Sequence, residues 1–199
     1  TNSYKKYINY LNDLVSSPEY LKNINYWIEQ WDSGAGLLPY DLAYETNTFG
    51  ETKSVTAILG KDATEELTKN MQRIYRTGVN TILIAALIRT LANWKQQNSV
   101  GITLESLGRH EQEFDIDLSR TIGWFTAMYP LYFELPGSDW SAVIKLVKEK
   151  LMQVPGNGLY FGMGRYVSHS IQLKSLPYPQ ISFNYHGNSG DRAGHKEWN

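Results

Sequence analysis

GITLESLGRHEQEFDIDLSRTIGWFTAMYP, residues 101–130, combines a short strand, a charged loop and an aromatic run. Its apolar and β-branched start predicts a strand over 101–105 that ends on the carboxylate of Glu105. The charged run 109–117 reads as an ordered polar loop, and the aromatic run 124–129 leads back into a second strand. A carboxylate at a strand end beside such a loop is unusual for a segment that serves only the core.

Glu105 is therefore the best candidate for chemistry in this chain. The alternative is that Glu105 only forms an ion pair with Arg109 or Arg120, because most carboxylates in proteins do no chemistry.

The composition bounds what the chain can be. Its 199 residues suffice for one domain with a substantial core, and 42% hydrophobic and 20% charged residues are ordinary for a globular protein. A formal charge of −1 points neither to nucleic acid nor to an anionic membrane, and the longest apolar run, 82–88, is too short to span a bilayer. The absence of cysteine excludes a disulfide, a cysteine-ligated metal and a cysteine nucleophile, and fits a cytoplasmic location.

The periodicity of the apolar residues predicts an α/β chain. The predicted strands cover 53–59, 99–105, 128–135 and 180–185. The predicted helices cover 3–15, a segment opened by Pro18, a segment capped by Asp62 with Glu65 and ending at 75, the buried segment 79–94, and one capped by Gly137 and Ser138. Loops are predicted at 32–52 and at the Gly-rich 155–162, which lacks the residues of a phosphate loop, and little order is expected in the tail 188–199.

Two motifs carry a resemblance to a known family. Residues 119–130 read Ser-Arg-Thr-Ile-Gly-Trp-Phe-Thr-Ala-Met-Tyr-Pro, and a Ser-Arg-Thr-Val-Gly-Trp-Phe-Thr-Ser-Met-Tyr-Pro motif occurs in epimerization domains of nonribosomal peptide synthetases, members of the condensation-domain superfamily. Residues 105–110 resemble that family's Glu-Gly-His-Gly-Arg-Glu motif at Glu105, Gly108 and Arg109, and depart from it at Ser106, Leu107 and His110.

Other segments extend the resemblance over nearly the whole chain. They are Tyr26-Trp27 at the end of the linker helices, 38–41 (Leu-Pro-Tyr-Asp), the Gly-rich 155–162, and 183–187 (Phe-Asn-Tyr-His-Gly). The resemblance implies a chloramphenicol-acetyltransferase-like lobe, a mixed sheet with helices packed on one face. It also implies a division into a helical inter-lobe linker (1–31), the C-terminal lobe (32–187) and a flexible tail (188–199).

The resemblance implies roles for individual residues. Glu105 would be the acid/base group, Asn184 and Tyr185 would line the pocket near the thioester, and Arg120 and Trp124 would shape the tunnel. The substrate would be an aminoacyl or peptidyl thioester on the 4'-phosphopantetheine arm of a peptidyl carrier domain, with no cofactor bound directly. The implied partners are that carrier domain, the N-terminal lobe of the same domain and neighbouring synthetase domains, in antibiotic biosynthesis, with no nucleic acid and no membrane.

Three functions stay open. The first is the C-terminal lobe of an epimerization domain, inactive alone because the family's His-His-x-x-x-Asp motif is absent from this sequence. The second is a lobe of a condensation domain that forms peptide bonds. The third is a non-catalytic lobe that docks a carrier domain, which the departures at Ser106, Leu107 and His110 favour. No metal-ligand spacing and no Gly-x-Ser-x-Gly elbow supports another chemistry.

Overall fold

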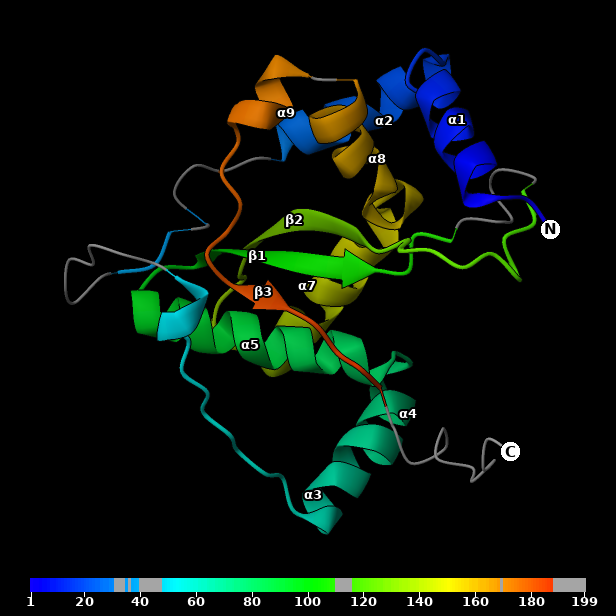
Figure 1. Ribbon diagram of the computed structural model, residues 1–199. Coiled ribbons are helices and arrows are strands. Elements are labelled where there is room, and N and C mark those ends of the chain that lie inside the picture. Colours follow the sequence, from blue (N-terminus) through cyan, green and yellow to red (C-terminus); the bar gives the residue numbers. More distant parts are fainter. Residues whose placement is uncertain (31–34, 36, 40–47, 110–115, 169, 188–199) are drawn as a thin grey trace, which may run out of the picture.

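A mixed three-stranded sheet forms the centre of the protein (Figure 1). The computed structural model describes residues 1–30, 35, 37–39, 48–109, 116–168 and 170–187. Strand β1 (Ser99–Ser106) is the middle strand, antiparallel to β2 (Ala127–Glu134) and parallel to β3 (Ser182–Phe183). The strands predicted at 99–105 and 128–135 are confirmed to within a residue, and the one at 180–185 is reduced to two residues.

One face of the sheet is apolar and is covered by helices. The register places three apolar residues of β1 opposite three of β2, and all six are buried: Val100, Ile102, Leu104, Tyr129, Leu131 and Phe133. Buried residues of the helices α5 (Val79–Lys95) and α7 (Trp140–Gln153) belong to the same hydrophobic cluster as the residues of this face (Figure 1). The predicted α/β class, with a mixed sheet and helices packed on one face, is confirmed.

The helix α5 is largely covered by the rest of the protein, as its apolar residues on nearly all sides predict. Its Ile84, Ala85 and Ile88 are completely buried between the sheet and α7. The cap predicted for α7 is corrected: Asp139, rather than Gly137 and Ser138, caps the helix, and its carboxylate accepts a hydrogen bond of 2.8 Å from the backbone amide of Ala142 in the first turn.

The two N-terminal helices pack on the same core. Helices α1 (Tyr4–Leu14) and α2 (Pro18–Glu29) begin at the serine caps Ser3 and Ser17, close to the predicted boundaries. Trp27 of α2 is only 1% exposed, and its indole contacts the rings of Tyr129 and Phe161 edge-on at 5.6 and 5.4 Å between centroids. Burial of this large side chain therefore joins α2 to the sheet.

The predicted strand 53–59 is wrong. This segment is extended but pairs with no strand among the described residues, and Val55 and Ile58 are 98% and 91% exposed. In Figure 1 the segment, in cyan, runs away from the body of the protein toward α3 (Lys61–Glu65). A β-branched pattern gives a strand only where a neighbour supplies hydrogen bonds and an apolar face, and the described residues supply neither here.

The helix that follows begins differently from the prediction. Gly60 is its N-cap, and Asp62 lies inside the first turn without capping it. The helix continues from α3 through a π-helical stretch (Glu66–Met71) into α4 (Gln72–Tyr75), where Arg76 ends it in the left-handed region at φ 47°. The predicted end at residue 75 is confirmed, whereas the capping box is not.

The predicted loop 155–162 is a loop only in its first half. A 3-10 turn (Pro155–Gly158) leads into α8 (Leu159–Gly162), a π-helical turn (Met163–Val167) and α9 (Ile171–Ser175). The glycines of this segment have low helix propensity, so the sequence does not predict α8. Leu159, Tyr160 and Phe161 are buried, and their burial stabilises the helix. The predicted loop 32–52 contains a 3-10 turn (Phe49–Glu51); Tyr40, Asp41, His110 and the tail 188–199 lie outside the described residues.

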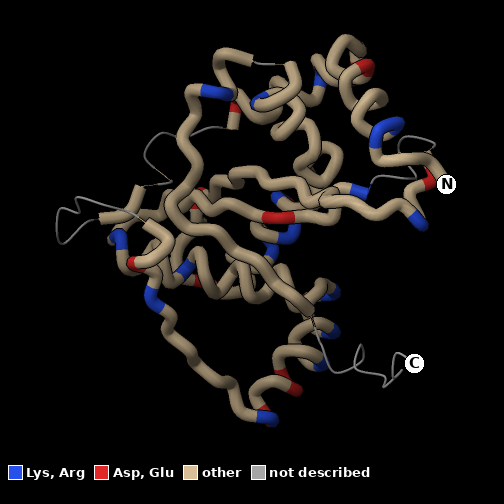
Figure 2. The backbone as a smooth tube through the Cα atoms, viewed as in Figure 1, with Lys and Arg blue, Asp and Glu red and all other residues tan. Residues whose placement is uncertain are grey.

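Charged residues of both signs are spread over helices and loops, and few lie in the sheet (Figure 2). The strands β1 and β2 carry only two, Glu105 and Glu134, one near each end of the paired strands. No described helix is long and apolar enough to cross a membrane.

Candidate functional site

Glu105 lies near the end of β1 and is held by Asn184. The Nδ2 amide of Asn184 donates a hydrogen bond of 2.7 Å to Oε2 of Glu105. The contact follows from the parallel pairing of β1 and β3, because Leu104 is the register partner of Phe183 and these two residues are followed in the chain by Glu105 and Asn184. Among the described residues, nothing donates to the second carboxylate oxygen, so Oε1 is available to a ligand.

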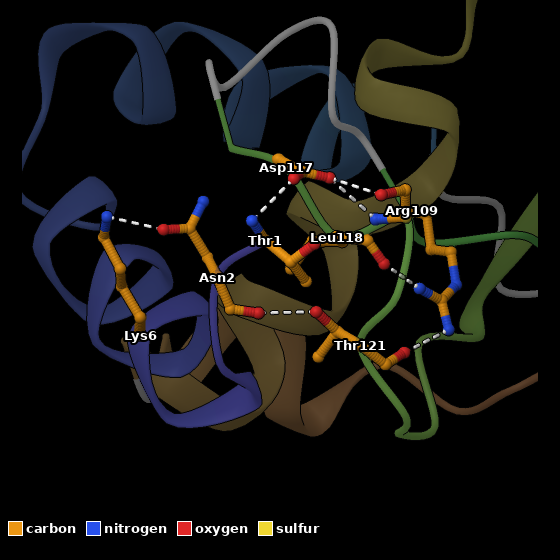
Figure 3. A network of polar contacts seen from close by, with 8 residues as sticks. Thr1, Asn2, Lys6, Arg109, Asp117, Leu118 and Thr121 are labelled. Carbon is orange, nitrogen blue, oxygen red and sulfur yellow. Dashed lines mark hydrogen bonds and ion pairs between the residues drawn. The ribbon is translucent and has the colours of Figure 1, made fainter.

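Glu105 and Arg109 do not form the ion pair that was the alternative to a chemical role for Glu105. The Arg109 guanidinium donates to the carbonyl oxygens of Leu118 and Thr121 at 2.6 and 2.8 Å (Figure 3). It also lies 4.1 Å above the centre of the Phe125 ring. Arg109 thus holds the segment 118–125 rather than the carboxylate.

Arg120 does not approach Glu105 either. Its side chain is exposed, and the ion pairs found in the described part of the chain do not include Glu105. The carboxylate of Glu105 is therefore free of a cationic partner there.

Glu105 borders an open cavity of about 400 Å³. The cavity is lined by Glu105, Ser106, Leu107, Trp124, Thr126, Asn184, Tyr185 and His186. A second cavity, of about 250 Å³, shares Glu105, Asn184 and Tyr185 with the first. The structure thus brings together four of the five predicted site residues, while Arg120 lines neither cavity.

Helix α1 holds the loop that carries Trp124. The hydroxyl of Tyr7 donates to the Gly108 carbonyl at 3.0 Å, and that of Tyr4 donates to the Trp124 carbonyl at 3.1 Å. Gly108 must be glycine, because a Cβ there would stand 1.8 Å from the carbonyl oxygen of Phe125. These contacts fix the backbone around Trp124 and leave its indole 81% exposed at the cavity.

Two further hydrogen bonds join Asn2 to the loop 116–125. The Thr121 hydroxyl donates to the carbonyl of Asn2, and the backbone amide of Asn2 donates to the carbonyl of Asp117 at 2.6 Å (Figure 3). The start of the chain and the loop 116–125 therefore form one hydrogen-bonded unit beside the cavity.

Three polar residues of the cavity were not predicted as site residues. Ser106 differs from the family's motif, yet it lines the cavity and its hydroxyl donates to the Asn157 carbonyl at 2.6 Å. Thr126 and His186 also line it. The signal that could have found them is their place in the chain, because each lies within two residues of a predicted site residue.

The arrangement around Glu105 is suited to proton transfer. A carboxylate with one oxygen fixed by an amide and the other open to a cavity can accept or donate a proton at a bound ligand. Within the described ranges, no three histidine, aspartate or glutamate side chains come together to hold a metal ion.

Comparison with known proteins places the fold and the family. The Condensation domain family matches residues 1–197. Surfactin synthase subunit 2 of Bacillus subtilis (strain 168) is 36% identical over 187 residues, which cover 94% of this chain and 5% of that protein. Bacitracin synthase 2 of Bacillus licheniformis is 33% identical over 188 residues, covering 94% of this chain and 7% of that protein.

Solved structures show the same architecture. The epimerization domain from the third module of tyrocidine synthetase B superposes with a TM-score of 0.79 at 31% identity, over 93% of this chain and 42% of that chain. The X-domain from teicoplanin biosynthesis, at 16% identity and a TM-score of 0.66, covers 88% of this chain and 40% of that one and shares the fold. The chain thus spans less than half of either solved domain and a small part of the synthases. The expected chloramphenicol-acetyltransferase-like fold is confirmed, and the chain belongs to the condensation-domain family.

Proposed function

We propose that this chain is the C-terminal lobe of an epimerization domain of a nonribosomal peptide synthetase, which inverts the Cα of a carrier-bound aminoacyl or peptidyl thioester. The observation that carries the proposal is the Glu105 carboxylate, fixed by Asn184 and open to a cavity. The likeness to the tyrocidine epimerization domain and the motif at 119–130 support this choice within the family.

The reaction is an acid/base proton transfer. The Glu105 carboxylate accepts the Cα proton or, when protonated, returns one, and the intermediate is an enolate of the thioester. Its oxygen needs hydrogen-bond donors, and Thr126 and Tyr185, which both carry a hydroxyl, line the same cavity. Inversion needs a second group on the opposite face of the substrate. The family's His-His-x-x-x-Asp motif would supply it from the N-terminal lobe, so this lobe alone is incomplete.

The other proposed binding residues differ in their support. Asn184 and Tyr185 line both cavities, and Trp124 forms a wall of the larger one. Arg120 is exposed and lines neither cavity, so the geometry does not support a contact between Arg120 and the substrate. The proposed partners are a peptidyl carrier domain with its phosphopantetheine arm, the N-terminal lobe and neighbouring synthetase domains, in the cytoplasm.

The test uses the two-lobe domain and an aminoacyl thioester on a carrier domain in heavy water. Deuterium incorporated at Cα is measured by mass spectrometry. Glu105→Gln keeps the shape of the side chain and its contact with Asn184 but removes the base, so exchange should fall to background while carrier binding persists. The matched control is Glu134→Gln, an exposed carboxylate near the opposite end of the paired strands, which should exchange at the wild-type rate.

The remaining functions predict different results. Exchange at the wild-type rate in Glu105→Gln would remove Glu105 from the mechanism. Peptide-bond formation between two loaded carriers, without Cα exchange, would identify a condensation domain. Carrier binding with neither reaction would identify a docking lobe.

A further inference from the structure

Three large apolar side chains at or near the larger cavity are almost fully exposed. Leu107 and Trp124, 86% and 81% exposed, both line this cavity together with Glu105. Ile122, two residues before Trp124 in the same loop, is 96% exposed. Single exposed apolar residues are ordinary, but several at one place mark a surface that another molecule covers. We call Leu107, Ile122 and Trp124 the rim patch.

The backbone that carries the rim patch is fixed by hydrogen bonds. The Tyr4 hydroxyl donates to the Trp124 carbonyl at 3.1 Å. The Arg109 guanidinium donates to the carbonyl of Thr121, the residue before Ile122, at 2.8 Å (Figure 3). A surface that is already formed loses less conformational entropy when a partner binds, so these bonds favour binding at the rim patch.

The chemistry of the rim patch fits the centre of a protein interface. Its three side chains carry no charge, and one of them is an indole. Met128, the register partner of Glu105 on β2, is 44% exposed and extends the apolar surface to the strand. Interface centres are depleted of charged residues and enriched in aromatic ones, among which tryptophan often contributes most to the binding energy.

The needs of the site indicate which partner covers this surface. Inversion requires a second acid/base group across the substrate from Glu105, and the body that carries this group must come close to the larger cavity. Leu107 and Trp124 line that cavity, so this body meets the rim patch. A carrier domain presents its substrate on a long arm, and its own surface does not need to reach the cavity. The chain spans 42% of the tyrocidine epimerization domain, whose larger part has no counterpart here.

We propose that the rim patch is a docking surface for the N-terminal lobe of the same domain, and that this contact sets the second acid/base group opposite Glu105. The inference rests on the proposed function, which supplies the need for that group. In the two-lobe domain the indole of Trp124 is then buried between the lobes at the edge of the larger cavity, where it excludes water from the reacting carbon.

The first test is hydroxyl-radical footprinting of the unaltered protein, read for each peptide by mass spectrometry. It compares this chain alone with the two-lobe domain, without a carrier. Trp124 should be oxidised at least about tenfold more slowly in the two-lobe domain, because a side chain under an interface reacts only when the interface opens. Trp94 and Trp140, which are 53% and 49% exposed and do not line the larger cavity, should react at rates within about twofold of each other in the two forms.

The second test introduces a thiol, since the chain contains no cysteine. Ile122→Cys should be alkylated by iodoacetamide at least about tenfold more slowly in the two-lobe domain than in the chain alone. Met152→Cys, at a position of α7 that is 77% exposed, is the matched control and should react equally in both. Ile122 lines neither cavity, so its protection reports a covering lobe rather than a bound substrate. Unchanged melting temperatures would show that both variants are folded.

The outcomes separate this inference from the proposed function. Protection of both Trp124 and Ile122→Cys without a carrier supports the docking surface. If both stay reactive, if only Trp124 is protected, or if protection appears only after a carrier domain is added, the N-terminal lobe does not cover the rim patch. Neither test depends on the reaction: exchange lost in Glu105→Gln would support epimerization even with an exposed rim patch. A protected rim patch in a domain that exchanges no Cα proton would contradict epimerization and not the docking surface.

Discussion

The hydroxyl of Tyr7 donates a 3.0 Å hydrogen bond to the carbonyl of Gly108, a residue 101 positions further along the chain. The Tyr7 ring is buried and lies 5.2 Å from the ring of Phe125, centre to centre. Tyr4 packs on Phe125 from one turn earlier in α1 and holds the Trp124 carbonyl. One helix therefore positions both sides of the loop that borders the larger cavity.

Tyr7→Phe should lower the free energy of unfolding by about 1 kcal/mol, because a buried carbonyl loses its donor while the ring packing is kept. Urea unfolding of the chain measures the change. Tyr4→Phe is the matched comparison: its bond is exposed and water can replace it, so its effect should be smaller. Equal effects of the two substitutions would contradict the burial argument.

Trp124→Ala should change the free energy of unfolding by no more than about 0.5 kcal/mol, because the indole is 81% exposed. A loss of about 3 kcal/mol is expected instead for Trp27→Ala, because the Trp27 side chain is only 1% exposed. Thermal unfolding of both variants checks this contrast. A large loss of stability in Trp124→Ala would show that the indole packs on the protein in solution.

Gly158→Ala should be strongly destabilising, by about 2 kcal/mol or more, for two reasons that add. Gly158 has φ +90°, and a Cβ there would stand 1.8 Å from Cδ1 of the buried Tyr129 ring. Gly137→Ala separates the reasons, since Gly137 has φ +114° with no atom within 4 Å of the added Cβ. Gly137→Ala should lower the free energy of unfolding by only about 1 kcal/mol, the cost of a non-glycine residue at positive φ. Denaturant unfolding of the two variants gives the comparison.

Alkaline pH should destabilise the fold through buried tyrosines. Burial raises the pKa values of Tyr7 and Tyr129 from 10.0 to about 12, so the native state keeps two protons that the unfolded chain loses near pH 10. Their contribution is complete below about pH 10 and is lost as pH rises through about 12. The free energy of unfolding, measured against pH, should fall in this window and less steeply in Tyr7→Phe. A flat profile up to pH 12 would contradict the raised pKa values.

The sequence predicts the sheet well where strands are buried. The periodicity located β1, β2 and the helix α5, because residues such as Ile102, Leu131 and Ile84 are buried where the pattern says they should be. It failed at 53–59, where Val55 and Ile58 have the residue types of a strand but lack a neighbour among the described residues. Strand propensity is local information, whereas a strand needs a partner.

The candidate site was predictable in part for a similar reason. Glu105, Trp124, Asn184 and Tyr185 came from motifs, and the structure brings them together. Arg120 lies within the best-matched motif but lines neither cavity, because a motif fixes the order of residues and not the direction of each side chain.

The smaller cavity had no signal in the sequence. Its lining comes from α5, β1, β2, α7 and the segment around β3, so only the packing of five separate elements creates it.

The bonds around Glu105 also have a consequence for the order of folding. The contacts of Glu105 with Asn184, Ser106 with Asn157, Tyr7 with Gly108 and Tyr4 with Trp124 close loops of 79, 51, 101 and 120 residues. Closing long loops costs chain entropy before any contact compensates for it, so contacts of this kind form slowly. We therefore expect helices such as α5 to form early and the surroundings of Glu105 to be assembled among the last parts of the native structure.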